Sequence, residues 1–245
     1  MTDVLGMRAA DRGVLVGTSG TGKSTLAAHV LACFRREYPD SRILVLDTKP
    51  RWRADRVVSG GRAGRLYRKY GKGDMIPGSV SLSDMSDWSL AWAKDAFPTQ
   101  TVIAQRLSGS QEANVAFQIL CAQRFFDTQT YARPSMIYLD EGHDFFHTNS
   151  AARSASDIIQ RCTRAGRERN LATLVGLQRP KGVNLQVLTE TSWIALFRLK
   201  YAEDIRRLAE LGWPTNASAP GWDEPFVFRL WRDTTPGAPK YKLDR

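Results

Sequence analysis

Residues 17–24, which read GTSGTGKS, constrain the fold of this chain more than any other part of its sequence. They match the pattern G-x-x-x-x-G-K-[ST] at every fixed position, with an apolar run (13–17) before them and an amphipathic stretch (24–37) after them. The three glycines let the backbone curl so that its N–H groups point at phosphate oxygens, and the start of the following helix adds partial positive charge. The sequence therefore predicts a phosphate-binding loop between a buried strand and a helix.

The side chains of this loop have separate expected roles in binding ATP. Lys23 is expected to bridge the β- and γ-phosphates, and the hydroxyl of Ser24 is expected to ligate Mg²⁺. A chance glycine-rich turn would lack the strand and the helix on its two sides. The other residues expected to contact the nucleotide are Gly17, Thr18, Ser19, Gly20, Thr21, Gly22 and Thr25.

A second apolar run, residues 135–140, ends in an acidic pair, Asp140 and Glu141. A carboxylate at the end of a buried strand can hold Mg²⁺, which is the expected role of Asp140. Glu141 directly after it can orient and deprotonate an attacking water, which favours hydrolysis over transfer to another substrate. The alternative interpretation is a surface acidic pair at a strand end.

A third apolar run (171–177) is followed by Gln178. The carboxyl end of a parallel strand faces the ligand, so Gln178 can reach the γ-phosphate or the attacking water. Just upstream, Arg164, Arg167 and Arg169 lie at the end of a predicted helix. They are either a solvated helix end or the source of an arginine finger offered to a neighbouring subunit.

Short apolar runs alternate with amphipathic stretches along most of the chain. The expected strands are 13–17, 43–47, 101–105, 135–140, 171–177 and 193–199, and the expected helices are 24–37, 111–127, 153–168 and 201–211. Several of the apolar runs are continuous, as expected of parallel strands covered on both faces. The pattern predicts an α/β domain with a mostly parallel central sheet and helices on both faces.

Three segments interrupt the alternation, namely residues 48–80, residues 212–225 and the tail from Thr234. Residues 48–80 are rich in Gly and Arg and are expected to be irregular, and they include a basic insertion at about 50–78. Residues 225–233 are expected to form a last strand, at a sheet edge because a proline leads it. The chain is therefore interpreted as one domain, 1–233, followed by a flexible tail, 234–245.

The chain carries 35 Lys and Arg against 25 Asp and Glu, a formal charge of +10, which favours a polyanionic partner such as nucleic acid. Residues 51–72 hold eight basic residues and one acidic residue, a net charge of +7. This stretch is either a solvated insertion or a loop that grips DNA phosphates. In the second interpretation Arg62, Arg65 and Arg68 contact DNA.

Cysteine usage and hydropathy indicate where such a chain works. The three cysteines are far apart in the sequence and odd in number, which favours a reducing cytoplasm over a disulfide framework. No apolar run approaches the roughly 18–20 residues needed to cross a bilayer, so no stable membrane insertion is expected. The first residues lack the apolar stretch of a signal peptide.

Taken together, the motifs resemble the FtsK–HerA superfamily of ring-forming, DNA-pumping ATPases. Four elements carry the resemblance, in the family's order: the P-loop; Leu46-Asp47-Thr48-Lys49, similar to D-x-K; Asp140-Glu141-Gly142-His143, close to D-E-A-H; and Gly166-Arg167 leading to Gln178-Arg179-Pro180, similar to G-R…T-Q-R-P. The chain departs from the pattern at Gly142, where Ala is usual, and at Leu177, where Thr is usual.

The resemblance implies a RecA-like α/β fold and a homo-oligomeric ring of five or six subunits with ATP sites at the subunit boundaries. It implies that Arg167 is the arginine finger, that Gln178 senses the γ-phosphate, and that the cargo is double-stranded DNA. The length is similar to that of the small genome-packaging ATPases of tailless, membrane-containing viruses, which implies a capsid portal or vertex protein as a partner and a place in host cytoplasm and virion. A repair or conjugation motor, and a nucleotide switch that pumps nothing, are the alternatives.

Overall fold

The fold is taken from a computed structural model. The residues that it describes are 7–48, 52–59, 62–65, 75–92, 101–106, 109–146, 153–183, 185–213, 224, 226–232 and 240–243. In this part of the chain no helix is both long enough and apolar enough to span a bilayer.

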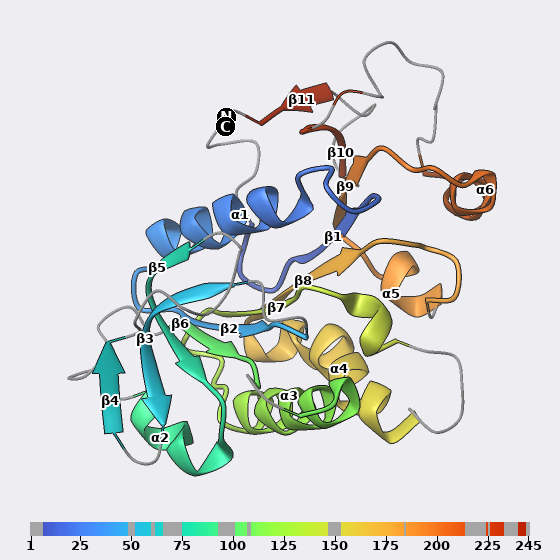
Figure 1. The fold of residues 1–245 in the computed structure, drawn as a ribbon. Helices are drawn as coiled ribbons and strands as arrows, with labels where there is room; N and C mark the ends of the chain where they lie inside the picture. The colour runs from blue at the N-terminus through green and yellow to red at the C-terminus, as the bar shows by residue number, and fades with distance from the viewer. Residues whose placement is uncertain are drawn as a thin grey trace.

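The described strands form one sheet of eleven strands (Figure 1). In chain order they are β1 (Arg12–Val16), β2 (Arg42–Leu46), β3 (Arg53–Ser59), β4 (Arg62–Arg65), β5 (Met75–Leu82), β6 (Thr101–Ala104), β7 (Ser135–Leu139), β8 (Leu171–Leu177), β9 (Trp193–Phe197), β10 (Val227–Arg232) and β11 (Lys240–Lys242). Across the sheet the order is β11-β10-β9-β1-β8-β7-β2-β6-β5-β3-β4.

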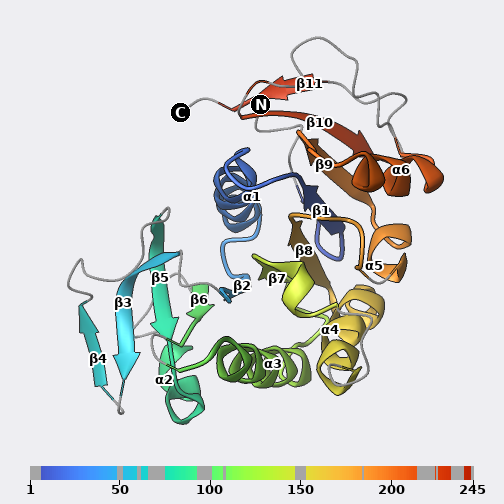
Figure 2. The same ribbon diagram turned by 45° about the vertical axis from the view of Figure 1, so that its right-hand side comes forward.

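The strands from β9 to β3 in this order are parallel to one another, and antiparallel strands extend the sheet at both ends. At one end β4 pairs with β3, and at the other β10 pairs with β9 and β11 with β10. Figure 2 shows β3 to β5 at one end of the molecule and β9 to β11 at the other, with β1, β7 and β8 between them. The predicted mostly parallel sheet is confirmed.

Helices cover both faces of the sheet. They are α1 (Lys23–Glu37), α2 (Trp88–Ala91), α3 (Gln111–Asp127), α4 (Arg153–Ala165), α5 (Leu185–Thr189) and α6 (Ala202–Glu210). In Figure 1, α1 lies on one side of the central strands and α3 and α4 lie on the other.

Alternate residues of the central strands pack against these two layers. Leu15 of β1 belongs to the apolar cluster under α1, whereas its neighbours Val14 and Val16 belong to the cluster that contains residues of α3 and α4. Both faces of the strand are therefore buried, and a strand buried on both faces needs a continuous apolar sequence. This is why the apolar runs predicted these strands within one or two residues.

The predicted helices also form, with small differences at their ends. The helix over 111–127 is confirmed to the residue, and Ser110 caps it by accepting a hydrogen bond from the backbone N–H of Ala113, at 3.2 Å. The helix expected over 153–168 ends at Ala165 and is followed by a short 3-10 turn, Arg167–Arg169. Helix ends are where sequence signals are weakest.

Two expectations about the interrupted segments are wrong. Residues 48–80 are not irregular throughout, because β3, β4 and most of β5 lie within them. Gly and Pro interrupt the apolar alternation there, so the strands depend on pairing with the sheet rather than on their own propensity. Likewise β10 is not the edge strand, because β11 pairs outside it, with Phe228 opposite Tyr241.

Strand β11 lies within 234–245, the segment expected to be a flexible tail. The proline that suggested an edge position, Pro225, lies outside the described residues, and β10 itself begins at Val227 and contains no proline.

Candidate functional site

The three predicted nucleotide elements meet at one edge of the sheet. Strands β1, β8 and β7 are neighbours in the sheet and parallel, with Val16 paired to Leu177 and Leu139 paired to Val175. Their carboxyl ends therefore lie side by side. The P-loop follows β1, Gln178 follows β8, and Asp140 with Glu141 follows β7.

The P-loop is anchored on the strands at both of its sides. The backbone N–H of Gly17 donates to the carbonyl oxygen of Leu177 at 3.0 Å, and that of Thr18 donates to the carbonyl oxygen of Arg198, just beyond β9, at 3.1 Å. Within the loop, the Thr21 hydroxyl donates to the carbonyl oxygen of Thr18 at 2.8 Å. These bonds fix the loop before any ligand is bound.

The loop ends at the first turn of α1, and the start of a helix is suited to bind an anion. Gly22, the N-cap of α1, has a φ of 107°, a left-handed conformation that a side chain would disfavour. The first turn of α1 contains no acidic residue, so the partial positive charge of the helix start is not neutralised locally. Lys23, the first residue of α1, donates from its ammonium group to the carbonyl oxygens of Gly17 and Thr18 at 2.7 and 2.9 Å. The ammonium group therefore lies against the loop that it is expected to serve.

The acidic pair at the end of β7 is buried, with Asp140 and Glu141 each 4% exposed. This excludes the interpretation as a surface acidic pair. The Tyr138 hydroxyl donates to Asp140 Oδ1 at 2.7 Å, and the Gln178 side-chain amide donates to Glu141 Oε1. The residues expected to act as base and as γ-phosphate sensor are thus in direct contact.

A third carboxylate, that of Asp47, acts on Tyr138 together with Asp140 and Glu141. Burial raises the pKa of Tyr138 well above its ordinary value, and the charge of Asp140, its hydrogen bond, and the charges of Asp47 and Glu141 raise it further. Asp47 follows β2, the other neighbour of β7, and accepts a hydrogen bond from the backbone N–H of Trp52 at 2.9 Å. The D-x-K aspartate therefore lies close to the pair, whereas Lys49 lies outside the described residues.

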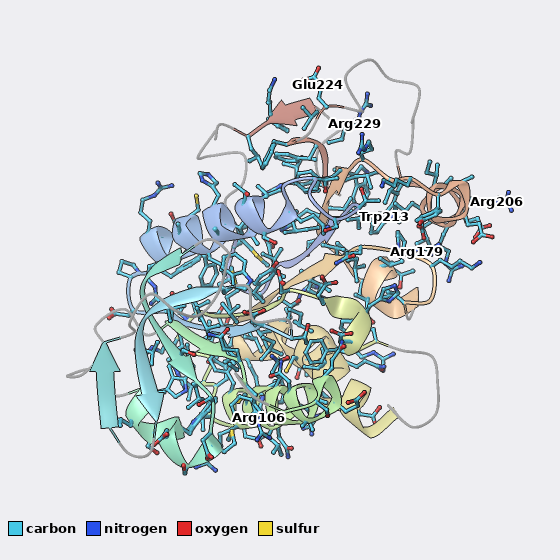
Figure 3. All side chains as sticks on the ribbon, in the orientation of Figure 1. Arg106, Arg179, Arg206, Trp213, Glu224 and Arg229 are labelled. Carbon is cyan, nitrogen blue, oxygen red and sulfur yellow. The ribbon has the colours of Figure 1, made fainter. Side chains whose placement is uncertain are left out.

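Sequence reasoning missed Asp204 in the first turn of α6. It is 1% exposed, its Oδ2 pairs with Arg179 Nε at 3.2 Å, and its Oδ1 accepts from the backbone N–H of Lys181 at 3.1 Å. The guanidinium of Arg179 also lies over the ring of Tyr201, 4.2 Å from the ring centroid. Figure 3 shows Arg179 on the side of the molecule where α5 and α6 lie. Asp204 thus orients the segment directly after Gln178, and the only sequence signal was an acidic residue at a helix start.

The three arginines considered for a finger lie at the opposite edge, before β8 begins. Arg169 donates to the carbonyl oxygen of Phe126 at 2.9 Å and stacks on its ring, and Arg164 pairs with Glu190 at 3.6 Å. Arg167 is exposed. A seven-residue strand is about 23 Å long, so an arginine before β8 is far from the P-loop of its own chain.

The proposed DNA contacts lie far from this site along the sheet. Arg62 and Arg65 are the first and last residues of β4. This strand is the edge strand at one end of the sheet, seven strand spacings from β1. Arg68 lies outside the described residues. Neighbouring strands are about 4.8 Å apart, which places β4 about 34 Å from β1 along the sheet.

Neither a protein-family model nor a curated protein matches this sequence. Solved structures match its fold. The genome packaging NTPase B204 from Sulfolobus turreted icosahedral virus 2, in complex with AMP, has a TM-score of 0.63 and 13% identity over 98% of this chain and 100% of that chain. In complex with ATP-gammaS the same NTPase has a TM-score of 0.61 and 15% identity over the same shares.

The conjugation coupling protein TcpA of pCW3, in its monomer form with ATPgS, has a TM-score of 0.53 and 11% identity over 98% of this chain and 61% of that chain. The chain thus spans all of B204 and about three fifths of TcpA. These similarities confirm the predicted RecA-like α/β fold of a P-loop NTPase.

Proposed function

We propose that this chain is a Mg²⁺-dependent ATPase that translocates double-stranded DNA, and that its task is to package a viral genome. The observation that carries the ATPase assignment is the arrangement of one edge of the sheet. The P-loop, Gln178 and the buried pair of Asp140 and Glu141 follow three adjacent parallel strands. A triphosphate in the loop would therefore have an acceptor for a water proton beside its γ-phosphate.

The donor set suits Mg²⁺. The Ser24 hydroxyl and the Asp140 carboxylate are the oxygen ligands that this ion prefers, and Tyr138 holds the carboxylate by a hydrogen bond. Bound there, Mg²⁺ would neutralise charge on the β- and γ-phosphate oxygens. Lys23 would exchange its two carbonyl partners for those phosphates, because an ammonium group binds a phosphate oxygen more strongly than a neutral carbonyl.

In this proposal Glu141 is the base and Gln178 controls it. The Gln178 amide occupies one oxygen of the Glu141 carboxylate. A γ-phosphate that draws the amide toward itself would leave that oxygen available to accept a proton from water. Hydrolysis would then depend on the presence of the γ-phosphate, as a motor requires.

Several observations support DNA as the cargo. B204 is a genome packaging NTPase, TcpA is a conjugation coupling protein, and this chain has their fold. The net charge of +10 suits a polyanionic track. Packaging is preferred over conjugation because the TM-score with B204, 0.63, is higher than the TM-score with TcpA, 0.53.

The motor is proposed to be a homo-oligomeric ring of five or six subunits. Arg167 lies too far from its own P-loop to contact a bound γ-phosphate, so it would act on the site of a neighbouring subunit. A capsid portal or vertex protein would hold the ring, which would work in host cytoplasm and accompany the virion. The single-domain interpretation of 1–233 belongs to this proposal, with each subunit contributing one ATP site.

The proposal is tested by phosphate release in the presence of Mg²⁺, with and without double-stranded DNA. We expect wild-type protein to hydrolyse ATP and DNA to accelerate it, with long duplexes accelerating more than short ones. Lys23→Ala should be inactive both with and without DNA, since the phosphates lose their cationic partner. ATP hydrolysis indifferent to DNA would favour a nucleotide switch instead.

A further inference from the structure

A buried carboxylate joins the start of α6 to the segment that follows Gln178. Both oxygens of Asp204 are engaged there, because Oδ2 pairs with Arg179 Nε at 3.2 Å and Oδ1 accepts from the backbone N–H of Lys181 at 3.1 Å. Asp204 itself is 1% exposed. A carboxylate taken out of water in this way needs charged and hydrogen-bonded partners. The contact therefore fixes α6 and this segment to each other.

The position of this contact along the chain connects it to the ATPase site. Arg179 directly follows Gln178, and consecutive Cα atoms are a fixed distance of about 3.8 Å apart. A shift of Arg179 therefore also shifts Gln178. The Gln178 side-chain amide in turn donates to Glu141 Oε1, on the carboxylate that is proposed to be the base. Asp204 is thus linked to the base through two consecutive residues.

Helix stability alone does not account for a buried carboxylate at this place. An acidic residue in the first turn of a helix is favourable on the surface, and Glu203 already provides one in α6. Glu203 is exposed and pairs with Lys181 Nζ at 2.5 Å. Asp204 is buried instead, which costs desolvation that an exposed position would avoid. The difference between the two neighbours points to a role for Asp204 beyond the helix.

The P-loop has contacts of its own that do not involve this carboxylate. Thr18 donates from its backbone N–H to the carbonyl oxygen of Arg198, directly after β9, at 3.1 Å. The carbonyl oxygen of Thr21 accepts from the backbone N–H of Phe226, directly before β10, at 3.1 Å. Both contacts come from ends of sheet strands. Loss of the Asp204 charge should therefore leave the phosphate-binding loop in place.

We propose that Asp204 is a positioning residue of the ATPase reaction, which holds Gln178 against Glu141 through Arg179 and the backbone of Lys181. The inference rests on the proposed function, in which Gln178 controls the base. Asp204 acts through Gln178 and not on the phosphates. Its loss should therefore slow hydrolysis and spare the binding of ATP.

The test measures kcat and KM for ATP, with Mg²⁺, in Asp204→Asn. Asparagine keeps the size of the side chain and an oxygen for the Lys181 N–H, and it removes the charge that pairs with Arg179. We expect kcat to fall about 10- to 100-fold, the scale of a misplacement of about 1 Å. KM should change by less than about twofold, because the lost interaction positions a group for hydrolysis and does not bind the substrate.

A second background separates positioning from support of the fold. Gln178→Ala removes the residue through which Asp204 is proposed to act. In this background Asp204→Asn should change kcat by less than about twofold, because residues that act as one unit are not additive. A residue that only supports the fold would lower kcat by the same factor in both backgrounds.

The matched control is Glu203→Gln, which breaks the exposed pair with Lys181 in the same helical turn and should leave kcat unchanged. Arg179→Gln breaks the pair with Asp204 from its side, where the Arg179 side chain is 42% exposed. It should reproduce the effect of Asp204→Asn in both backgrounds, and it serves as the test if Asp204→Asn does not fold.

Unchanged kcat in Asp204→Asn, or an equal loss in both backgrounds, would overturn the proposal. A rise in KM that accounts for the lost activity would overturn it as well. In each of these cases the wild-type protein still hydrolyses ATP, so the proposed function stands. Wild-type protein that does not hydrolyse ATP would overturn the proposed function and this inference with it.

Discussion

Leu177 Cδ2 lies 2.7 Å from the position that a Cβ atom on Gly142 would occupy. These two residues are the two departures from the FtsK–HerA pattern, which usually has Ala and Thr at the corresponding places. Val175 Cγ1 lies 2.5 Å from the same position, so Gly142 has no room for a methyl group. The side chain of Leu177 on β8 thus lies against the space beside Gly142, and we expect the two departures to compensate in part.

Gly142→Ala should therefore destabilise the protein by roughly 1–3 kcal/mol, the usual cost of overpacking. Leu177→Thr in the same chain should recover part of that loss, because the shortened side chain removes one of the close contacts. Urea unfolding of both single variants and of the double variant gives the coupling energy directly. Strictly additive costs would show that the two residues do not compensate.

Glu141→Gln should bind ATP as wild type does and lose hydrolysis by roughly 10²–10⁴-fold, since only the proton acceptor is removed. Calorimetry measures the binding and phosphate release measures the turnover. Asp144→Asn is the matched control: its carboxylate lies three residues further on and accepts from the Gln111 amide at 3.1 Å. Wild-type hydrolysis by Glu141→Gln would refute the assignment of the base.

Arg167 should act across a subunit boundary, where an arginine finger contributes about 10³–10⁵ in rate. Mixing two inactive proteins, Arg167→Ala and Glu141→Gln, creates interfaces with both groups intact, so part of the ATPase activity should return. Arg164→Ala serves as the comparison, because its partner Glu190 also pairs with Arg12 at 2.5 Å. No recovery in rings shown to be mixed would argue against a finger in trans.

Replacing Arg62, Arg65 and Arg68 by Ala should reduce the slope of log DNA affinity against log salt by up to about 0.9 per lost phosphate contact. ATPase activity without DNA should persist, because β4 is the outermost strand of the sheet. A control with Arg36→Ala and Arg124→Ala removes exposed positive charge from α1 and α3 instead. An unchanged slope in the triple variant would mean that these arginines belong to a solvated insertion.

The sequence predicted the central strands because their environment is uniform. A strand such as β7 is buried on both faces along its whole length, and its residues after Ser135 are Met, Ile, Tyr and Leu. Strands β3, β4 and β5 lie toward the sheet's end and contain Arg, Gly and Pro, so their strand structure comes from their neighbours. The same holds for β11, whose three residues carry no signal of their own.

The residues of the candidate site likewise include some that the sequence predicted and some that it did not. The P-loop, Asp140, Glu141 and Gln178 follow strands whose order made their meeting predictable. Asp204 and Phe226 contact this region from elements remote in sequence. The only local signal for Asp204 is its place at a helix start, and Phe226 has none. The positive φ of Phe226 is a property of the backbone that its residue type argues against.

The span between β1 and β4 has a mechanical consequence. The P-loop and the basic strand are joined by a continuous hydrogen-bonded sheet about 34 Å across. If this span moved as a rigid arm, a rotation of about 6° at the P-loop would displace the far end by roughly 3.5 Å, close to the rise of about 3.4 Å per base pair along the axis of duplex DNA. If the proposed motor holds DNA at β4, a tilt of this size at the P-loop would be enough for a step of one base pair.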